Sequence, residues 1–359
     1  ILVKEGKIVE IGKNLEVPEK CEIVDAEGMQ VYPGFVDAHS HLGTIGSSIG
    51  FEGDDVNEMT DILTPHLRGI DCIEPMDVTF AEAREGGVTT VCVGPGSANV
   101  VGGTFVAIKT VGKRVDDMVV REGVAMKCAF GENPKRCYKD KNNFSRMSTA
   151  AKLRELLFKT QEYNAKLQAA EDDPSKKPAF DFKLEAMLPV IRKEIPIKVH
   201  AHRADDMFTA LRIAKEFDLK ITLEHVTDGS LIVEELAKEN VMLAVGPSFG
   251  HRTKFELKNK SFKTPGDLAN AGCHVSIITD APVIPQQYLR LCAGLAVNEG
   301  MKEFDALKAI TINAAEHAGV ADRVGSLEVG KDADIVITDG CLFESQSKVL
   351  ATYIDGKKV

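Results

Sequence analysis

The sequence contains no long apolar run, no closely paired cysteines, no tryptophan and no excess of basic residues. Because no apolar run reaches about 18 residues, we expect no membrane-spanning helix. The eight cysteines include no Cys-x-x-Cys pair, which favours reduced thiols over a disulfide framework. The formal net charge of −10 argues against nucleic acid and anionic membranes as partners, since both attract basic surfaces. The absence of tryptophan supports no conclusion.

The chain also lacks an initiator methionine and a signal-peptide pattern at its start, Ile1–Lys4. We therefore expect a trimmed chain. The scattered cysteines indicate a cytoplasmic protein, and we expect its partner to be a small-molecule substrate.

Strand and helix patterns alternate through most of the 359 residues. A strand followed by a helix, repeated about eight times, indicates a parallel sheet with helical crossovers. An open doubly wound sheet and a closed barrel both fit, and the length favours an α/β fold of the (β/α)8 TIM-barrel type, which takes about 250 residues. The predicted strands are Val36–His41, Thr89–Val93, Phe105–Lys109, Val124–Phe130, Ile197–His202, Ile221–His225, Val241–Val245 and Val275–Thr279. The predicted helices are Val78–Glu85, Thr149–Leu167, Phe182–Lys193, Asp205–Glu216, Ser230–Lys238 and Phe304–His317.

Short strand patterns at both ends of the chain indicate a second, smaller unit. They are Ile8–Gly12, Glu22–Asp25, Gly325–Leu327, Ala333–Ile337 and Thr352–Lys357. We expect residues 1–32 and 325–359 to form one composite β-sandwich domain, and residues 33–324 to form the barrel. The long polar segment Gly43–Asp77 breaks the alternation, and it predicts a lid or a subunit contact in a homo-oligomer.

The stretch Val31–His41 carries two histidines at alternate positions. Residues two apart on a strand point to the same face, so His39 and His41 would lie side by side and could share one metal ion. Pro33–Gly34 just before them marks a turn at which a new element begins. Two ordinary histidines near a strand end are the alternative interpretation, and the ligands supplied elsewhere in the chain favour the metal site.

Polar residues also occur at the carboxyl ends of other predicted strands. They are Glu132, His200, His202, His225 and Asp280. In a barrel these strand ends share one rim, so residues far apart in sequence converge. Imidazole nitrogens and carboxylate oxygens suit Zn²⁺ and similar divalent ions. One such residue alone is more often structural, but the whole set predicts a metal site.

Several motifs resemble those of the amidohydrolase superfamily of metal-dependent hydrolases, across nearly the full length of the chain. These motifs are Pro33–His41, Val199–His202, Glu224–His225, Thr279–Asp280, Thr311–Ala315 and Gly325–Asp334. The resemblance is closest to the imidazolonepropionase-like and prolidase-like branch. It implies a barrel carrying a β-sandwich from both termini, one or two divalent ions with Zn²⁺ expected, and hydrolysis of a carbon–nitrogen bond in an amide, a cyclic amide or a dipeptide.

The resemblance also implies roles for the residues at the strand ends. His39, His41 and Asp280 would bind the more buried ion. His200 and His225 would bind a second ion, or one of them would join the first. His200 is preferred as ligand because it precedes an alanine, as in the family, and His202 then contacts substrate or supports the ligands; the reverse assignment stays open.

The bridging group between two ions has three alternatives. Relatives with two ions use a glutamate or a carboxylated lysine from a middle strand, and the matching residues here are Glu132 at the rim and Lys127 deeper in the strand. Glu132 is our first expectation. Lys127 is the second, and a single ion without a bridge is the third.

In the implied mechanism Asp280 accepts a proton from water and passes it to the leaving nitrogen, while the metal or a histidine such as His202 polarises the carbonyl. The deaminase-like branch carries a glutamate where this chain has Arg203, which argues against the alternative of an aminohydrolase acting on a heterocycle. An inactive barrel scaffold is a further alternative that the retained ligands disfavour.

Basic residues on the predicted rim loops are candidate substrate contacts. They are Arg136, Arg203, His251 and Arg252. Arginine forms bidentate pairs with carboxylates, so a carboxylate-bearing substrate would explain them.

Overall fold

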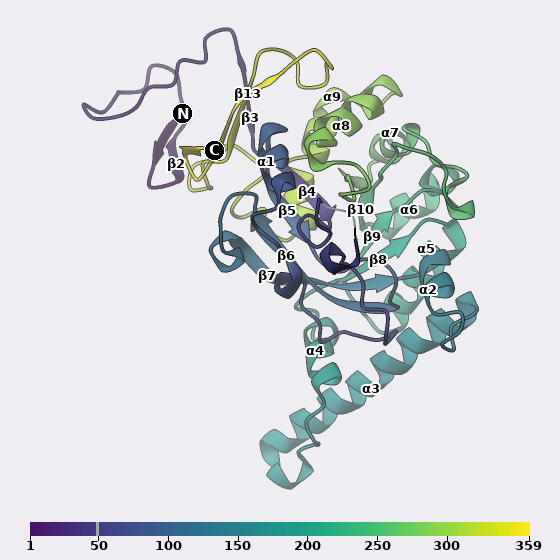
Figure 1. The fold of residues 1–359 in the computed structure, drawn as a ribbon. Helices are drawn as coiled ribbons and strands as arrows, with labels where there is room; N and C mark the ends of the chain where they lie inside the picture. The colour runs from purple at the N-terminus through teal and green to yellow at the C-terminus, as the bar shows by residue number, and fades with distance from the viewer. Residues whose placement is uncertain (48–49) are drawn as a thin grey trace.

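An eight-stranded, nearly closed sheet in the order β11-β10-β9-β8-β7-β6-β5-β4 forms the centre of the molecule (Figure 1). This computed structural model describes residues 1–47 and 50–359. The strands are β4 (Phe35–Ser40), β5 (Val88–Val93), β6 (Val101–Lys109), β7 (Val119–Ala129), β8 (Ile197–Ala201), β9 (Ile221–His225), β10 (Met242–Val245) and β11 (His274–Ile277). The predicted α/β barrel with an added sheet from the termini is confirmed.

The strands form because their side chains are buried on both faces of the sheet. All six residues of β5, with the sequence VTTVCV, are buried, and so are all residues of β4 and β8. Runs rich in β-branched residues are typical of barrel strands, whose outer face packs on helices and whose inner face fills the barrel.

The sheet differs from the predicted parallel arrangement at one strand. β6 runs antiparallel to both β5 and β7, whereas the other ladders are parallel. The connections before and after β6, residues 94–100 and 110–118, are too short for the crossover of a dozen or more residues that a parallel neighbour requires. β5, β6 and β7 therefore form a meander within the barrel.

Helices pack around the outside of the sheet (Figure 1). They are α1 (Val78–Glu85), α2 (Glu132–Cys137), α3 (Arg146–Asp172), α4 (Phe182–Ile191), α5 (Ala204–Glu216), α6 (Val233–Glu239), α7 (Lys263–Asn270), α8 (Leu289–Asn298), α9 (Glu303–Ala309) and α10 (Ile312–His317). The 3₁₀ turns are η1 (Phe51–Gly53), η2 (Gly69–Cys72), η3 (Val115–Met118), η4 (Pro174–Lys176), η5 (Gly229–Leu231), η6 (Phe255–Leu257) and η7 (Gln286–Tyr288). Helices α2, α7 and α8 were not predicted. No described helix is both long and apolar enough to cross a membrane.

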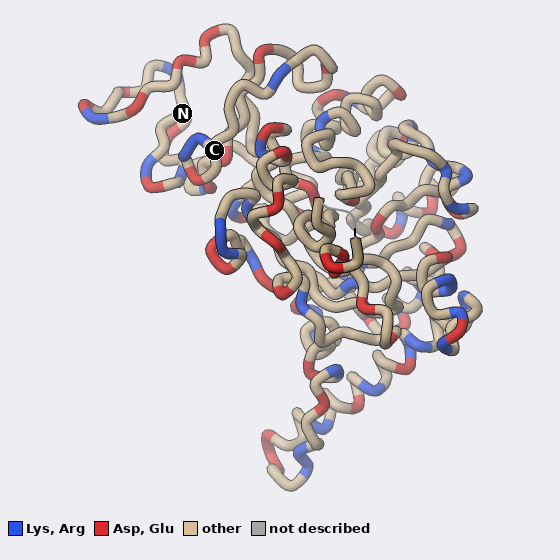
Figure 2. The backbone as a smooth tube through the Cα atoms, in the orientation of Figure 1, with Lys and Arg blue, Asp and Glu red and all other residues tan. Residues whose placement is uncertain are grey.

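Helix α3 extends away from the barrel together with α4 (Figure 1). Its barrel-proximal half buries Leu153, Leu156 and Leu157, whereas its far half is mostly exposed. Acidic and basic residues are interleaved along it (Figure 2), and two Glu–Lys pairs lie at the i,i+4 spacing that stabilises exposed helices.

Strands from both ends of the chain pair beside the barrel. β3 (Gln30–Pro33) pairs with β12 (Ile335–Thr338) in a four-stranded sheet with β13 (Val349–Ile354) and β14 (Lys357–Lys358), and β1 (Leu2–Lys4) pairs with β2 (Lys7–Glu10). The strands predicted at 22–25 and 325–327 are wrong. Ile23 is 72% exposed, so the apolar residues there have no packed face on which a strand could form.

A buried cluster of charges joins the terminal sheet to the barrel. The Lys109 ammonium at the end of β6 lies 2.6 Å from the Asp334 carboxylate and 3.0 Å from that of Asp332. The side chains of all three residues are at most 6% exposed. Removing one partner would leave a buried charge uncompensated.

The segment Gly43–Asp77 covers part of the barrel rim, and two of its residues, 48 and 49, lie outside the described part of the chain. The Tyr138 hydroxyl lies 2.5 Å from the Glu58 carbonyl oxygen and 3.0 Å from that of Asp61. The Asn99 side-chain amide donates to the same two carbonyls at 2.8 Å. These bonds fix the middle of the segment to the loop after β5 and to α2.

Candidate metal centre and active site

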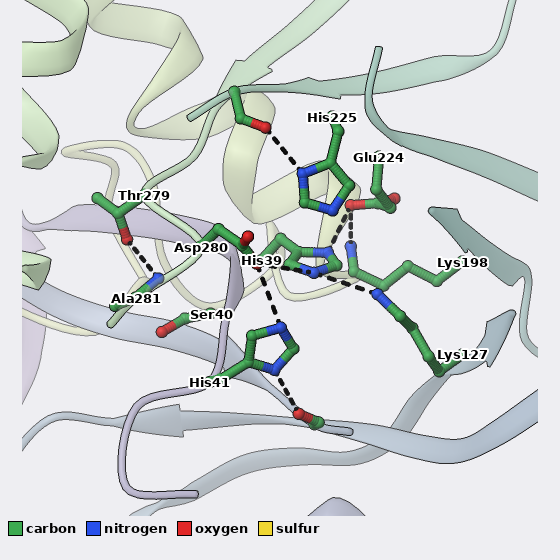
Figure 3. Close-up of polar contacts among 12 residues, drawn as sticks. His39, Ser40, His41, Lys127, Lys198, Glu224, His225, Thr279, Asp280 and Ala281 are labelled. Atoms are coloured by element: carbon green, nitrogen blue, oxygen red, sulfur yellow. Dashed lines mark hydrogen bonds and ion pairs between the residues drawn. The ribbon is translucent and has the colours of Figure 1, made fainter. Parts of the chain in front are cut away.

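Two groups of ligand-type side chains lie at the carboxyl ends of the barrel strands. The first group is His39, His41 and Asp280, and the second is His200, His202 and His225; the ligand atoms within each group lie within 4.8 Å of one another. Figure 3 shows the first group together with His225 of the second. The structure thus brings together the residues predicted from the strand ends, apart from Glu132.

The first group joins the end of β4 to the residue that follows β11. The Asp280 Oδ1 atom lies 3.2 Å from His41 Nε2 and 3.6 Å from His39 Nε2. His41 Nδ1 donates to the carbonyl oxygen of Gly94 at 2.7 Å. Because its Nδ1 carries the proton, the Nε2 lone pair of His41 faces the carboxylate and is available to a metal ion.

The carboxylate of Asp37 holds the two ends of the sheet in place around this group. It accepts from the backbone N–H of His39 at 3.0 Å and from the hydroxyl of Thr279 at 2.6 Å. The backbone N–H of His41 donates to the Ala281 carbonyl at 2.8 Å. These bonds link β4 to the segment after β11, where the two edge strands of the sheet meet.

The second group contains buried imidazole nitrogens without a hydrogen-bond partner among the described residues. His225 Nδ1 donates to the Gly246 carbonyl at 2.8 Å, and its Nε2 atom is unpaired, as are both ring nitrogens of His200. The centroids of these two rings lie 4.3 Å apart. Buried polar atoms normally have partners, so these nitrogens, next to a carboxylate and further imidazoles, fit a site for a divalent ion such as Zn²⁺.

His202 has contacts that distinguish it from His200. Its Nδ1 atom lies 2.8 Å from the Thr227 hydroxyl, and its Nε2 atom lies 3.4 Å from the Lys254 ammonium and 3.8 Å from a Glu256 oxygen. A lysine ammonium beside Nε2 competes with a metal ion for the same lone pair. This arrangement favours a substrate-facing histidine over a ligand.

The two candidate bridging residues lie in different surroundings. Lys127, on β7, is fully buried, and its amine lies 3.3 Å from His39 Nε2 (Figure 3). Burial lowers the pKa of the Lys127 amine to about 8. Glu132 begins α2, its backbone N–H donates to Glu256, and it belongs to neither ligand group.

The backbone at two site residues is strained. His225 has φ of +74° and Asp280 has φ of +54°, in the left-handed region that costs a non-glycine residue roughly 1–3 kcal/mol. At His225 this conformation has a clear effect: consecutive strand residues normally point to opposite faces, yet Glu224 and His225 both approach the ring of His39. Such strain is concentrated at functional sites.

Burial keeps the three imidazoles of the second group neutral. It lowers the pKa of His200 and His202 well below the usual value and that of His225 to about 4. Burial alone would raise the pKa of Asp280, but the nearby His225 and His41 hold it below its ordinary value. Neutral imidazoles and an ionised carboxylate are the states in which these groups bind metal ions.

The basic residues predicted to contact substrate are exposed or already engaged. The Arg203 guanidinium pairs with Asp205 at 2.7 and 2.9 Å, and that of Arg252 donates to the backbone carbonyls of residues 258 and 260. His251 and Arg136 are exposed. Lys254, which sequence reasoning missed, does contact the candidate site, because its ammonium lies 3.4 Å from His202 Nε2.

Sequence reasoning also missed three buried residues behind the ligands, namely Lys198, Glu224 and His317. Glu224 was part of a recognised motif, and a charged residue inside the barrel strand Ile221–His225 is the signal that could have singled it out. His317 had no such signal, because its contact depends on the packing of α10.

Comparison with known proteins establishes the class to which this chain belongs. Residues 30–359 match the model of the amidohydrolase family, so the chain belongs to that family and the predicted resemblance is confirmed. Several relatives carry the names of enzymes, and together with the family match they support the conclusion that this protein is a hydrolase acting on carbon–nitrogen bonds.

Three proteins of known name or structure illustrate what this chain is similar to. The amidohydrolase tasK of Hapsidospora irregularis is 26% identical over 391 residues, which cover 99% of this chain but only 39% of that protein. The imidazolonepropionase of Symbiobacterium thermophilum is 25% identical over 387 residues, covering 94% of this chain and 83% of that enzyme. The crystal structure of an amidohydrolase from Thermotoga maritima MSB8 superposes with a TM-score of 0.96 at 41% identity, covering 100% of this chain and 94% of that one.

Proposed function

We propose that this protein is a metal-dependent amidohydrolase that hydrolyses an amide, a cyclic amide or a dipeptide bond in a small substrate. The observation that carries the proposal is the convergence of His39, His41 and Asp280 with the unpaired nitrogens of His200 and His225 at one barrel rim. Imidazole and carboxylate ligands around an open position are typical of hydrolytic zinc sites, so we propose zinc as the metal.

His39, His41 and Asp280 would hold one ion, and His200 and His225 would hold a second. A bound divalent ion would supply a lowered pKa for water and polarisation of the scissile carbonyl. The chain itself supplies the neutral imidazoles, the ionised carboxylate and the buried surroundings.

Asp280 would act as general base and then as general acid. Its side chain is 16% exposed, so one oxygen can reach a water molecule while the other faces the histidines. Its carboxylate would accept the proton of the attacking water and deliver it to the leaving nitrogen.

His202 and Lys254 would position the substrate. His202 belongs to the second ligand group, and the ammonium of Lys254, whose side chain is 17% exposed, lies 3.4 Å from the His202 Nε2 atom. The Lys254 ammonium could bind the substrate carbonyl oxygen or a carboxylate next to it, and the His202 ring would orient that ammonium. Lys254 is a better supported contact than Arg203 or Arg252, whose guanidinium groups are occupied.

Lys127, in a carboxylated form, would bridge the two ions in preference to Glu132. The support is its position, 3.3 Å from the Nε2 atom of His39, whereas Glu132 belongs to neither ligand group.

The test combines metal analysis with a substrate panel. Protein purified without added metal is expected to contain zinc, and to release free amine and carboxylate from N-acyl amino acids, cyclic amides or dipeptides. Chelation should abolish this activity and zinc should restore it. Protein without affinity for zinc, or with activity unchanged by chelation, would contradict the proposal and favour an inactive scaffold.

An aminohydrolase that acts on a heterocycle is the second candidate. The likeness to an adenine deaminase of Lactobacillus delbrueckii, 23% identical over 361 residues, favours it, and the pairing of Arg203 with Asp205 at the position of the deaminase glutamate disfavours it. Stoichiometric release of ammonia from purines or pyrimidines, without release from amides, would decide for this candidate.

We also propose that the chain divides into a barrel of residues 33–324 and a composite domain of residues 1–32 and 325–359. The pairing of β3 with β12 supports this division.

A further inference from the structure

Glu224 is a fully buried carboxylate that contacts four side chains, of which His39 and Lys198 are drawn in Figure 3. One oxygen, Oε2, lies 2.9 Å from His39 Nδ1 and 2.8 Å from the Lys198 ammonium. The other, Oε1, lies 2.8 Å from His317 Nε2 and 2.7 Å from the hydroxyl of Thr222. His39, His317 and Thr222 form hydrogen bonds with the carboxylate, and the Lys198 ammonium forms an ion pair with it, so both oxygens are engaged by the protein itself.

We propose that Glu224 is a positioning residue that fixes the tautomer and orientation of His39 and strengthens it as a metal ligand. This inference rests on the proposed function, because it assigns a task to a residue behind the proposed metal site. Glu224 itself would touch neither metal nor substrate.

The tautomer follows from the chemistry of the two ring nitrogens. An ionised carboxylate only accepts hydrogen bonds, so His39 Nδ1 must carry the proton that it shares with Glu224. The Nε2 atom then has its lone pair directed into the site, where it lies 3.6 Å from Asp280 Oδ1. His41 and His225 obtain the same tautomer from backbone carbonyls, so His39 is distinguished by having a charged acceptor.

The charge of this acceptor matters because the surroundings are buried away from water. A carboxylate that accepts from the far nitrogen of a metal-bound histidine raises the basicity of that ligand, and loss of such a partner typically costs about 10–100-fold in metal affinity. The ring of His39 is fully buried, so water does not screen the interaction with Glu224.

Lys198 and His317 hold the carboxylate in place. Lys198 comes from β8, His317 from the end of α10 and Glu224 from β9, so three elements fix its position. Lys198 is 1% exposed and compensates the buried negative charge. This network explains why Lys198 and His317 are buried although neither belongs to a ligand group.

The experiment compares Glu224→Gln with Thr222→Val. Glutamine keeps the shape and one acceptor oxygen but removes the charge, so the zinc dissociation constant, measured by competition with a chelator, should rise about 10–100-fold. Valine removes one neighbour of the other carboxylate oxygen and leaves the contact with His39, so its zinc affinity should stay close to that of the wild type. Equal zinc affinity of Glu224→Gln and the wild type would overturn the proposal.

A second measurement uses the metal-free wild-type protein with ¹⁵N-labelled histidine. Imidazole NMR should show His39 protonated at Nδ1; protonation at Nε2 would overturn the proposal, even if the Glu224 variant does not fold. A protein that binds no zinc, or hydrolyses no amide, would contradict the proposed function while this tautomer remained measurable.

Discussion

At the scale of single residues, the candidate site depends on imidazoles whose free nitrogens are set by bonds made on the other side of the ring. His41 and His225 donate to backbone carbonyls, and His39 donates to Glu224. A metal site assembled this way needs little rearrangement to accept an ion, because each lone pair is already directed inwards.

Replacement of Asp280 by asparagine tests the proton-transfer role. The Asp280→Asn side chain keeps the shape but has no carboxylate to accept a proton, so kcat should fall at least about 10²–10⁴-fold, while circular dichroism and the unfolding midpoint show a folded protein. The control is Asp322→Asn at an exposed carboxylate, which should be fully active. Substantial activity of Asp280→Asn would remove this residue from the mechanism.

Lys127→Ala and Glu132→Gln together decide which residue bridges two ions. We expect Lys127→Ala to lose one ion per chain and nearly all activity, with partial rescue by a short carboxylic acid that occupies the vacated space. Glu132→Gln should keep both ions, because Glu132 lies outside the ligand groups. Metal analysis and turnover measure both effects, and the opposite pattern would restore Glu132 as the bridge.

Site residues could be predicted from the sequence where they lie on strands, because the two-residue period of a strand fixes the direction in which each side chain points. His39 and His41 alternate within one stretch, His200 and His225 lie near the ends of recognisable strands, and Asp280 follows another. Lys254 and His317 could not be found in this way, because their contacts depend on a loop and on the packing of a helix.

At the scale of elements, the direction of β6 was the feature that sequence patterns did not reveal. Alternation of buried side chains is the same in parallel and antiparallel strands, so the pattern predicts a strand and leaves its partner open. The antiparallel direction of β6 could have been inferred from the short connections on both sides of it, since they leave no room for a crossover helix.

The bonds made by Tyr138 predict how the rim segment responds to mutation. Tyr138→Phe removes the hydroxyl that contacts the carbonyls of Glu58 and Asp61, which should cost about 1–2 kcal/mol locally. Hydrogen exchange of residues 58–64 should accelerate, while exchange in the barrel strands stays unchanged. Tyr288→Phe, at a residue that is 46% exposed, serves as control, and equal protection in both variants would contradict the interpretation.

At the scale of the whole molecule, strand pairing joins the two ends of the chain to each other, and buried charge joins the sheet that they form to the barrel. Lys109→Met would leave Asp332 and Asp334 without their shared ammonium, so the free energy of unfolding should fall by about 3–5 kcal/mol. Urea denaturation measures this change. Lys113→Met, at an exposed position nearby, should change stability by less than about 0.5 kcal/mol.

The same cluster predicts an alkaline limit of stability. Burial alone would lower the pKa of Lys109, but Asp334 and Asp332 raise it above its ordinary value of 10.5. The contribution of the Lys109 ammonium to the free energy of unfolding is therefore complete below pH 10.5. It is lost as the pH rises through the pKa of Lys109 in the folded state. Wild-type protein should lose stability above about pH 10.5 more steeply than Lys109→Met; parallel curves would show that the ammonium is not coupled to folding.

The reversed third strand has a consequence for how this scaffold can diversify. In a regular barrel each strand delivers its own loop to the catalytic mouth, and new specificities arise by altering those loops one at a time. Here the turn that follows β5 also leads into β6, and its Gly94 carbonyl orients a proposed ligand. Evolution or a protein engineer therefore has one fewer independently variable loop, because lengthening this turn would disturb the catalytic centre itself.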